Sequence, residues 1–255
     1  MWRKQVLPKG LIAVVIMTVV ASVAVVTHFL LKKDVLNGEF HIPAQVPPYY
    51  SDTGHRADVG RYSAGLSAMD GEVVLETVGE MEKDWENLPV TAMYVAALRL
   101  FEIGERDLAL YWFQGAKYRG ILFVELLDGS SDTNRMGGKA YALSKAHEVF
   151  FRLLRPYIGG HGLCDIRKYE DSLQRAVFNR DVVPKLNKIY PEIVFLSEEQ
   201  WPGEAEKVKE NLKNRLNITV SGYDEIVKQR KAAGLHDQYC KRDSLTTEHT
   251  EGVND

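Results

Sequence analysis

One small group of residues could support catalysis. His161 lies among glycines at positions 159, 160 and 162, and Asp165 follows it. A histidine oriented by a carboxylate can act as a general base, so His161 and Asp165 define a candidate catalytic site. A histidine flanked by glycines is, however, typical of an exposed, flexible connection with no orienting partner. The sequence therefore favours a protein that is not an enzyme.

Other catalytic and ligand-binding patterns are missing from the sequence. It contains no Gly-x-Ser-x-Gly, His-Glu-x-x-His, P-loop or dinucleotide-binding pattern, and no Cys/His cluster with metal-ligand spacing. We therefore expect no cofactor and no metal site. The two cysteines, Cys164 and Cys240, are a candidate disulfide that would hold the C-terminal tail in an oxidising compartment. The sequence alone leaves open whether they pair.

Residues 11–31 form an apolar segment without a formal charge. A helix needs roughly 20 such residues to cross the hydrocarbon core of a bilayer. Five basic and no acidic residues lie between positions 1 and 33, three of the basic ones before the segment. The basic head, residues 1–10, is predicted to stay in the cytoplasm. This predicts a single-pass signal-anchor in the inner (cytoplasmic) membrane of a bacterium, with the C-terminal domain in the periplasm.

The alternative for the same segment is a cleaved signal peptide. Small residues around Ala24 loosely resemble a cleavage site, but the apolar run continues for seven residues beyond it. That length favours an uncleaved anchor. After residue 33 the chain has 27 basic and 35 acidic residues, a net charge of −8. An acidic outer region argues against nucleic acid as a partner.

The rest of the chain is predicted to be mostly α. Residues 34–85 form a linker and lead-in segment, residues 86–235 the helical domain, and residues 236–255 a flexible polar tail. Asn87, Asp107, Asp165 and Ser221 are expected to cap helices, and Pro156 to stop one. The expected helices cover about 87–103, 107–127, 139–155, 165–178, 201–216 and 222–235, with a short turn or helix at 183–190 and an ambiguous segment at 72–82.

Residues 96–120 carry a patterned pair of helices. Ala109, Trp112, Phe113, Ala116 and Gly120 follow one another at helical spacing after the break at position 104. This arrangement resembles a Sel1-like repeat, a relative of the tetratricopeptide repeat (TPR). The resemblance implies one helical hairpin in which the alanines admit the neighbouring helix and the aromatic residues fill the space between the two.

Two features depart from that pattern. The turn between the helices is shorter than in Sel1-like repeats, and Lys117 stands where a second alanine is expected. The wider arrangement resembles anchored proteins of the bacterial envelope, some of which are immunity proteins against secreted effectors. Trp112 and its neighbours are interpreted as core residues. Tyr111, Gln114 and Arg119, on other faces of the same helix, are therefore the candidate contacts for a protein partner.

These observations give three hypotheses. The first is a membrane-anchored periplasmic protein that binds another protein, for example an immunity protein that neutralises a secreted toxin. The alternative is a structural or scaffold subunit of a cell-envelope or secretion assembly. The third is an enzyme with a site at His161 and Asp165.

Overall fold

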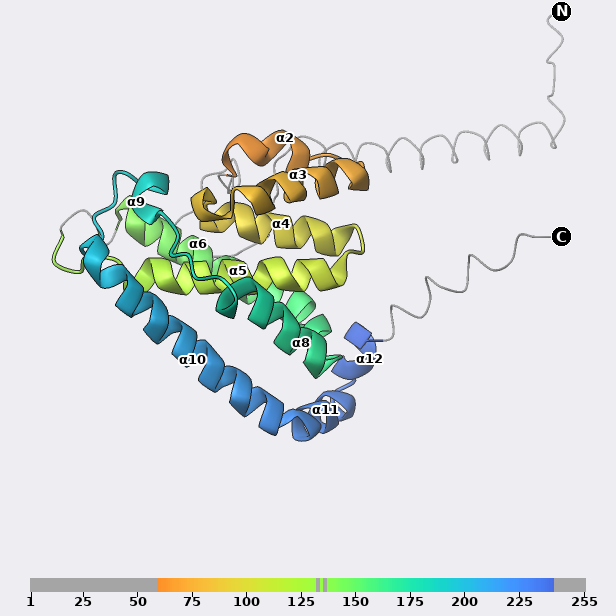
Figure 1. The fold of residues 1–255 in the computed structure, drawn as a ribbon. Coiled ribbons are helices and arrows are strands. Elements are labelled where there is room, and N and C mark those ends of the chain that lie inside the picture. The colour runs from red at the N-terminus through yellow and green to blue at the C-terminus, as the bar shows by residue number, and fades with distance from the viewer. Residues whose placement is uncertain (1–58, 132–133, 135–136, 241–255) are drawn as a thin grey trace, which may run out of the picture.

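The computed structural model describes residues 59–131, 134 and 137–240, which form an array of helices (Figure 1). Within that part of the chain there is no strand, only an isolated bridge between Leu127 and Phe195. The α-helices are α2 (Ser63–Leu66), α3 (Gly71–Lys83), α4 (Val90–Glu102), α5 (Arg106–Glu125), α6 (Lys139–Leu154), α7 (Gly160–Gly162), α8 (Ile166–Leu173), α9 (Leu186–Ile189), α10 (Trp201–Ser221), α11 (Tyr223–Ala232) and α12 (Leu235–Cys240). Short 3₁₀ turns are η1 (Gly60–Tyr62), η2 (Trp85–Asn87) and η6 (Glu198–Gln200), and π-helical turns are η4 (Arg155–Gly159) and η5 (Gln174–Phe178). The mostly α fold is confirmed.

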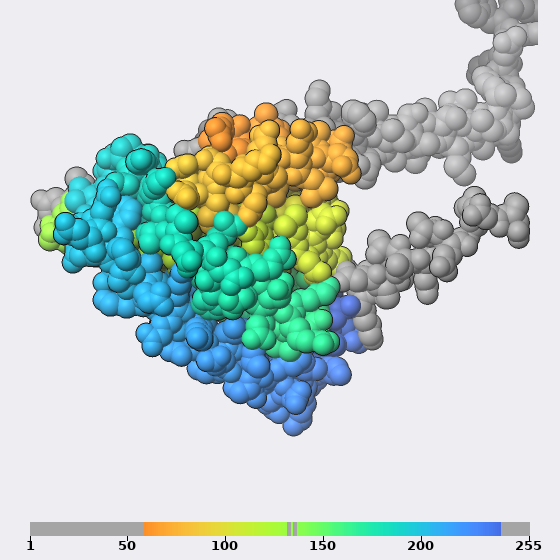
Figure 2. Space-filling model, in the orientation of Figure 1, coloured from red at the N-terminus to blue at the C-terminus, as the bar shows by residue number. Residues whose placement is uncertain are grey.

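α5 is the central helix, because α4, α6, α8 and α10 all pack against it. The predicted hairpin corresponds to α4 and α5, joined at Gly104, whose φ of +94° suits glycine. Ala109, Ala116 and Trp112 are fully buried, as the core interpretation of the motif requires. In Figure 2, α3 on one side and α8 and α10 on the other close over most of α5 on the face turned to the viewer.

The predicted lead-in segment, 34–85, is helical over much of its described part. α3 resolves the ambiguity at 72–82 as a helix, and Asp70 caps it by accepting from the backbone N–H of Glu72 at 2.9 Å. Val59, Tyr62 and Leu66 lie in the same hydrophobic core as the hairpin. Residues 59–85 therefore pack with the helical domain.

Three of the predicted caps are wrong. Asn87 lies in η2, and α4 begins after Pro89 without a side-chain cap. Asp107 lies inside α5, where its carboxylate contacts other helices, and Ser221 is the last residue of α10, which continues five residues beyond the expected end at 216. Asp165 does cap α8, accepting from the N–H of Arg167 at 3.0 Å. Side chains with a hydroxyl, amide or carboxylate group are favoured at helix N-caps, but they also bond with residues from other parts of the chain.

The segment 155–162 is helical, so the predicted break there is wrong. Pro156 lies in the first turn of η4, which follows α6 directly, and the chain continues into α7. The glycines admit neighbouring side chains. A Cβ on Gly162 would lie 2.8 Å from Leu110, and a Cβ on Gly160 would lie 3.2 Å from Tyr239. These glycines allow close packing. The sequence composition alone cannot tell glycines that allow close packing from glycines that make a segment flexible.

The C-terminal helices return to α7. Cys164 and Cys240 are joined in a disulfide, with their Cα atoms 5.5 Å apart across 76 residues of chain. Arg230 of α11 donates to the carbonyl of Gly160 at 2.7 Å and reinforces this closure. The first residues of the predicted flexible tail, up to Cys240, are therefore helical and bonded, and 241–255 lie outside the described residues.

The predicted membrane anchor also lies outside the described residues, which begin at 59. Within 59–131, 134 and 137–240, none of the helices combines the length and apolar character needed to cross a bilayer.

Candidate functional site: a cationic groove between α5, α6 and α10

The predicted contact residues on α5 are buried, so they do not form a surface for a partner. Tyr111 is 6% exposed, and Gln114 and Arg119 are 1% exposed each. Arg119 donates at 2.6 Å to the carbonyls of both Trp85 and Leu88, which ties α5 to the turn before α4. The Tyr111 hydroxyl donates to Glu82 at 2.8 Å. These side chains are internal because neighbouring helices cover the faces of α5 on which they lie.

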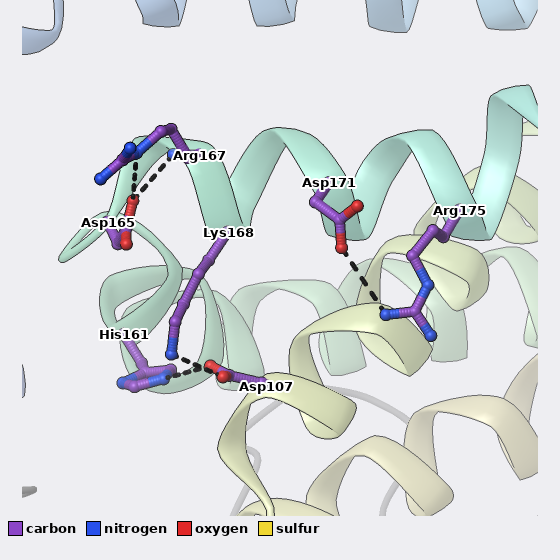
Figure 3. Close-up of polar contacts among 7 residues, drawn as sticks. All are labelled: Asp107, His161, Asp165, Arg167, Lys168, Asp171 and Arg175. Carbon is purple, nitrogen blue, oxygen red and sulfur yellow. Dashed lines mark hydrogen bonds and ion pairs between the residues drawn. The ribbon is translucent and has the colours of Figure 1, made fainter.

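The candidate catalytic pair is also placed differently from the prediction (Figure 3). His161 is 8% exposed, and its Nε2 lies 3.4 Å from a carboxylate oxygen of Asp107 rather than beside Asp165. Lys168 donates to the other Asp107 oxygen at 2.6 Å. Burial raises the pKa of Asp107, but the hydrogen bonds from Lys168 and His161 outweigh it and hold this pKa below its usual range.

This arrangement has a structural explanation. Asp107 at the start of α5 joins α7 through His161 and α8 through Lys168. Asp165 instead caps α8 and lies 3.9 Å from the guanidinium of Arg167. The prediction that His161 is exposed and lacks an orienting partner is therefore wrong. The two cavities discussed below are lined by neither His161 nor Asp165.

A groove of about 380 Å³ lies between α5, α6 and α10. α10 runs antiparallel to α5 and diverges from it, starting beside the end of α5 (Figure 1). α5 contributes every fourth residue, as expected for one helical face. The lining residues are Lys117, Ile121 and Glu125 from α5, His147 and Phe151 from α6, and Glu204, Lys207, Val208, Asn211, Leu212 and Arg215 from α10.

Lys117 is the most unusual residue of the groove. Its ammonium forms no hydrogen bond or ion pair with any residue in the described part of the chain, although most of the side chain is buried. Burial lowers the pKa of Lys117 to about 8, and the positive charges of Arg215 and Arg155 lower it further in the same direction. A strongly perturbed lysine in a cavity is a candidate functional residue.

His147 forms the floor of the groove beside Lys117. The Tyr94 hydroxyl lies 2.9 Å from Nδ1 of His147, and burial lowers the pKa of this histidine to about 4. The imidazole is therefore neutral at pH 7. Gly120 provides the space for it, because a Cβ there would lie 2.0 Å from His147 Nδ1. His147 is thus a fixed, uncharged wall, and Lys117 supplies the charge.

A second cavity, of about 630 Å³, lies beside η2 and residues 179–182. Four of its charged residues form ion pairs, and the Arg180 guanidinium stacks 3.8 Å from the Trp85 ring centroid. The ion pairs are Glu82 with Arg180, Asp84 with Arg61 and Glu86 with Lys185. The other two charged lining residues, Lys83 and Asp181, are exposed, so the described part of this cavity holds no buried unpaired charge like that of Lys117.

The groove is therefore the candidate site, and its chemistry is that of anion binding. Among the described residues no group of three or more His, Cys, Asp or Glu side chains is placed to hold a metal ion. Comparison of the chain with family models, curated proteins and solved structures finds no match. The site must therefore be interpreted from its own geometry.

Sequence reasoning missed Lys117, His147 and Arg215 as site residues. One signal was present, since Lys117 replaces the alanine of the Sel1-like pattern. The charges of α10 alternate in sign, as is typical of a solvated helix face, and the Lys207–Glu204 pair at 2.8 Å fits that pattern. Only the placement of α10 against α5 brings Arg215 to Lys117.

Proposed function

We propose that this chain is a single-pass, membrane-anchored domain that binds another protein outside the cytoplasmic membrane, with the groove between α5, α6 and α10 as its contact site. The observation that carries the proposal is the unneutralised ammonium of Lys117. Burying a charge without a counter-charge lowers stability. Proteins retain such a charge where function uses it, since activity and stability oppose each other at binding sites.

Two further features support the location. Disulfides persist in oxidising compartments, and Cys164 is bonded to Cys240. The apolar segment 11–31 has the length and flanking charges of an anchor whose C-terminal side faces outward. Together they favour the periplasmic side of the inner membrane.

The class of partner rests on the architecture. The resemblance to anchored envelope proteins favours a secreted toxin that this domain neutralises, and a subunit of an envelope or secretion assembly is the alternative. The size of the groove favours recognition of a short segment of either partner, because about 380 Å³ is the volume of a small-ligand site.

The test is affinity capture of the tagged full-length protein from crosslinked membranes, followed by mass spectrometry. Three variants are compared with the wild type: Lys117→Met and Arg215→Gln in the groove, and Lys213→Met on the exposed face of α10 as the matched control. We expect one protein to be captured by the wild type and the control, and to be lost with both groove variants.

The identity of the captured protein decides the class. A single toxin supports neutralisation, whereas several subunits of envelope machinery support the scaffold alternative. If the wild type captures no protein, the proposal of a protein-binding function is overturned.

A further inference from the structure

The groove has charges of opposite sign at its two ends. On α5, Lys117 and Glu125 are eight residues apart, which corresponds to about 12 Å along the helix axis. Because α10 is antiparallel, Arg215 lies at the Lys117 end and Glu204 at the Glu125 end. The groove is therefore cationic at one end and carboxylate-bearing at the other.

The cationic end is lined by Lys117 and Arg215, and a third cation, Arg155, lies near Lys117 without lining the groove. Lys117 Nζ and Arg155 Cζ each lie 5.9 Å from the centroid of the Phe151 ring, and Arg215 adds its charge to Lys117. Within the described part of the chain no carboxylate forms an ion pair with any of the three. Two lining cations without a counter-charge, with a third nearby, favour the binding of an anionic group.

The other end carries a carboxylate that is not neutralised. Glu204 is paired with Lys207 at 2.8 Å, but Glu125 is exposed and forms no ion pair with any described residue. Between the two ends the walls are apolar, with Ile121 and Leu212 facing the groove beside the Phe151 ring. A ligand that fits this pattern has an anionic group, an apolar middle and a basic group.

We propose that the groove binds an extended segment of the partner protein in which a carboxylate and a basic side chain are separated by about three residues. The inference rests on the proposed protein-binding function and names the chemistry that the partner presents. An extended chain advances about 3.3 Å per residue, so three to four residues span the roughly 12 Å between the charged ends. The carboxylate contacts Lys117 and Arg215, and the basic group contacts Glu125.

Charge argues against a polyanionic ligand. A nucleic acid or an anionic membrane would present phosphates along the whole groove, including the end that holds Glu125 and Glu204. These like charges oppose such a ligand. The net charge of −8 after residue 33 opposes it over a longer range. A ligand with a carboxylate at one end, an apolar middle and a basic group at the other end matches both ends of the groove.

The test uses labelled tetrapeptide mixtures and the full-length protein in detergent micelles, with binding followed by fluorescence anisotropy. Each mixture has Lys at the first position and mixed apolar residues at the second and third. One mixture ends in Glu with an amidated C-terminus, a second is its Gln counterpart, and a third ends in Leu with a free carboxylate. The second mixture removes only the negative charge, and the third distinguishes a terminal carboxylate from a side-chain one.

We expect the Glu mixture, the free-carboxylate mixture or both to bind about tenfold or more tightly than the Gln mixture, as for loss of one charge-assisted hydrogen bond. Lys117→Met and Arg215→Gln should each remove that preference, and Lys213→Met should retain it. Glu125→Gln should weaken only peptides that begin with Lys, not matched peptides that begin with Ala. Equal binding of all mixtures, or a preference that survives both groove variants, overturns the inference.

Two controls distinguish a loss of peptide recognition from a loss of folding and from a failure of the proposed protein-binding function. Arg215 is exposed, so Arg215→Gln reports on the groove even if Lys117→Met were to disturb the fold, and circular dichroism checks both variants. If membrane capture of a partner persists in both groove variants, the protein-binding function stands and the groove inference fails. If the peptides bind as expected but membranes yield no partner, the groove inference stands and the proposed function fails.

Discussion

His147 should make the stability of the domain depend on pH in a range where few other groups titrate. It is largely buried beside Tyr94, and burial lowers its pKa from the ordinary value of 6.5 to about 4. In the unfolded chain the imidazole becomes protonated as the pH falls through 6.5, whereas in the folded protein it stays neutral until about pH 4. The unfolded state therefore binds more protons over this interval, and stability is lost as the pH falls.

The size of the effect follows from the two pKa values. Each unit of pKa difference corresponds to about 1.4 kcal/mol. Between pH 7.5 and pH 5 the histidine should lower the free energy of unfolding by about 2 kcal/mol. Carboxylates with lowered pKa values, such as Asp84 and Glu148, contribute mainly at lower pH, because their ordinary values are 3.8 and 4.5. The interval from pH 7.5 to pH 5 therefore lies above the range in which these carboxylates titrate.

The assay is urea unfolding of the full chain at half-unit steps of pH, followed by circular dichroism. His147→Gln keeps a polar side chain for Tyr94 but cannot titrate, so its free energy of unfolding should stay nearly constant from pH 7.5 to pH 5. A wild-type protein that is equally stable at both pH values would refute the reasoning. So would a slope that persists unchanged in His147→Gln, because another group would then be responsible.

Three further predictions concern the same helices. Lys117→Met should raise the free energy of unfolding at pH 7 by about 2–3 kcal/mol in the same assay, because it removes a charge whose pKa is lowered to about 8. The wild type should regain this difference between about pH 8 and 10.5, and no gain in the variant would contradict the burial of the charge. Gly120→Ala should lower the free energy of unfolding by about 2 kcal/mol, because its Cβ would meet a histidine nitrogen at 2.0 Å. The control Gly79→Ala, with open space around it, should be neutral or raise stability by up to about 1 kcal/mol, and equal effects of the two would exclude the steric explanation. Replacing Cys164 and Cys240 by Ser should lower the free energy of unfolding by roughly 4 kcal/mol, as for closure of a long loop, and an unchanged urea midpoint would contradict this.

The helices that could be predicted are those whose signal is local. α4, α5, α6 and α10 repeat apolar residues every three to four positions, and this spacing is a property of the segment itself. The segment 155–162 was mispredicted because its glycines are explained by Leu110 and Tyr239, side chains from distant parts of the chain. Tertiary packing, which no local pattern contains, decides such positions.

The candidate site was harder to predict than the fold because it depends on how helices assemble. Tyr111, Gln114 and Arg119 were chosen as polar residues on the faces of α5 away from Trp112. That choice assumes that these faces are free, but α4, α6, α8 and α10 pack around α5 and cover them. Tyr111 and Arg119 therefore make internal contacts, and Arg119 donates to two carbonyl groups.

Lys117 explains why a groove exists at this place on α5. Ala116, one position earlier, is fully buried, and a small residue of this kind lets a neighbouring helix approach closely. An alanine at 117, as in the Sel1-like pattern, would remove the side chain that lines the groove between α6 and α10. The lysine instead fills part of that space with a long chain whose charged end repels Arg215 and Arg155. Closer packing would bring these three cations nearer without a counter-charge, so their repulsion opposes closure of the groove.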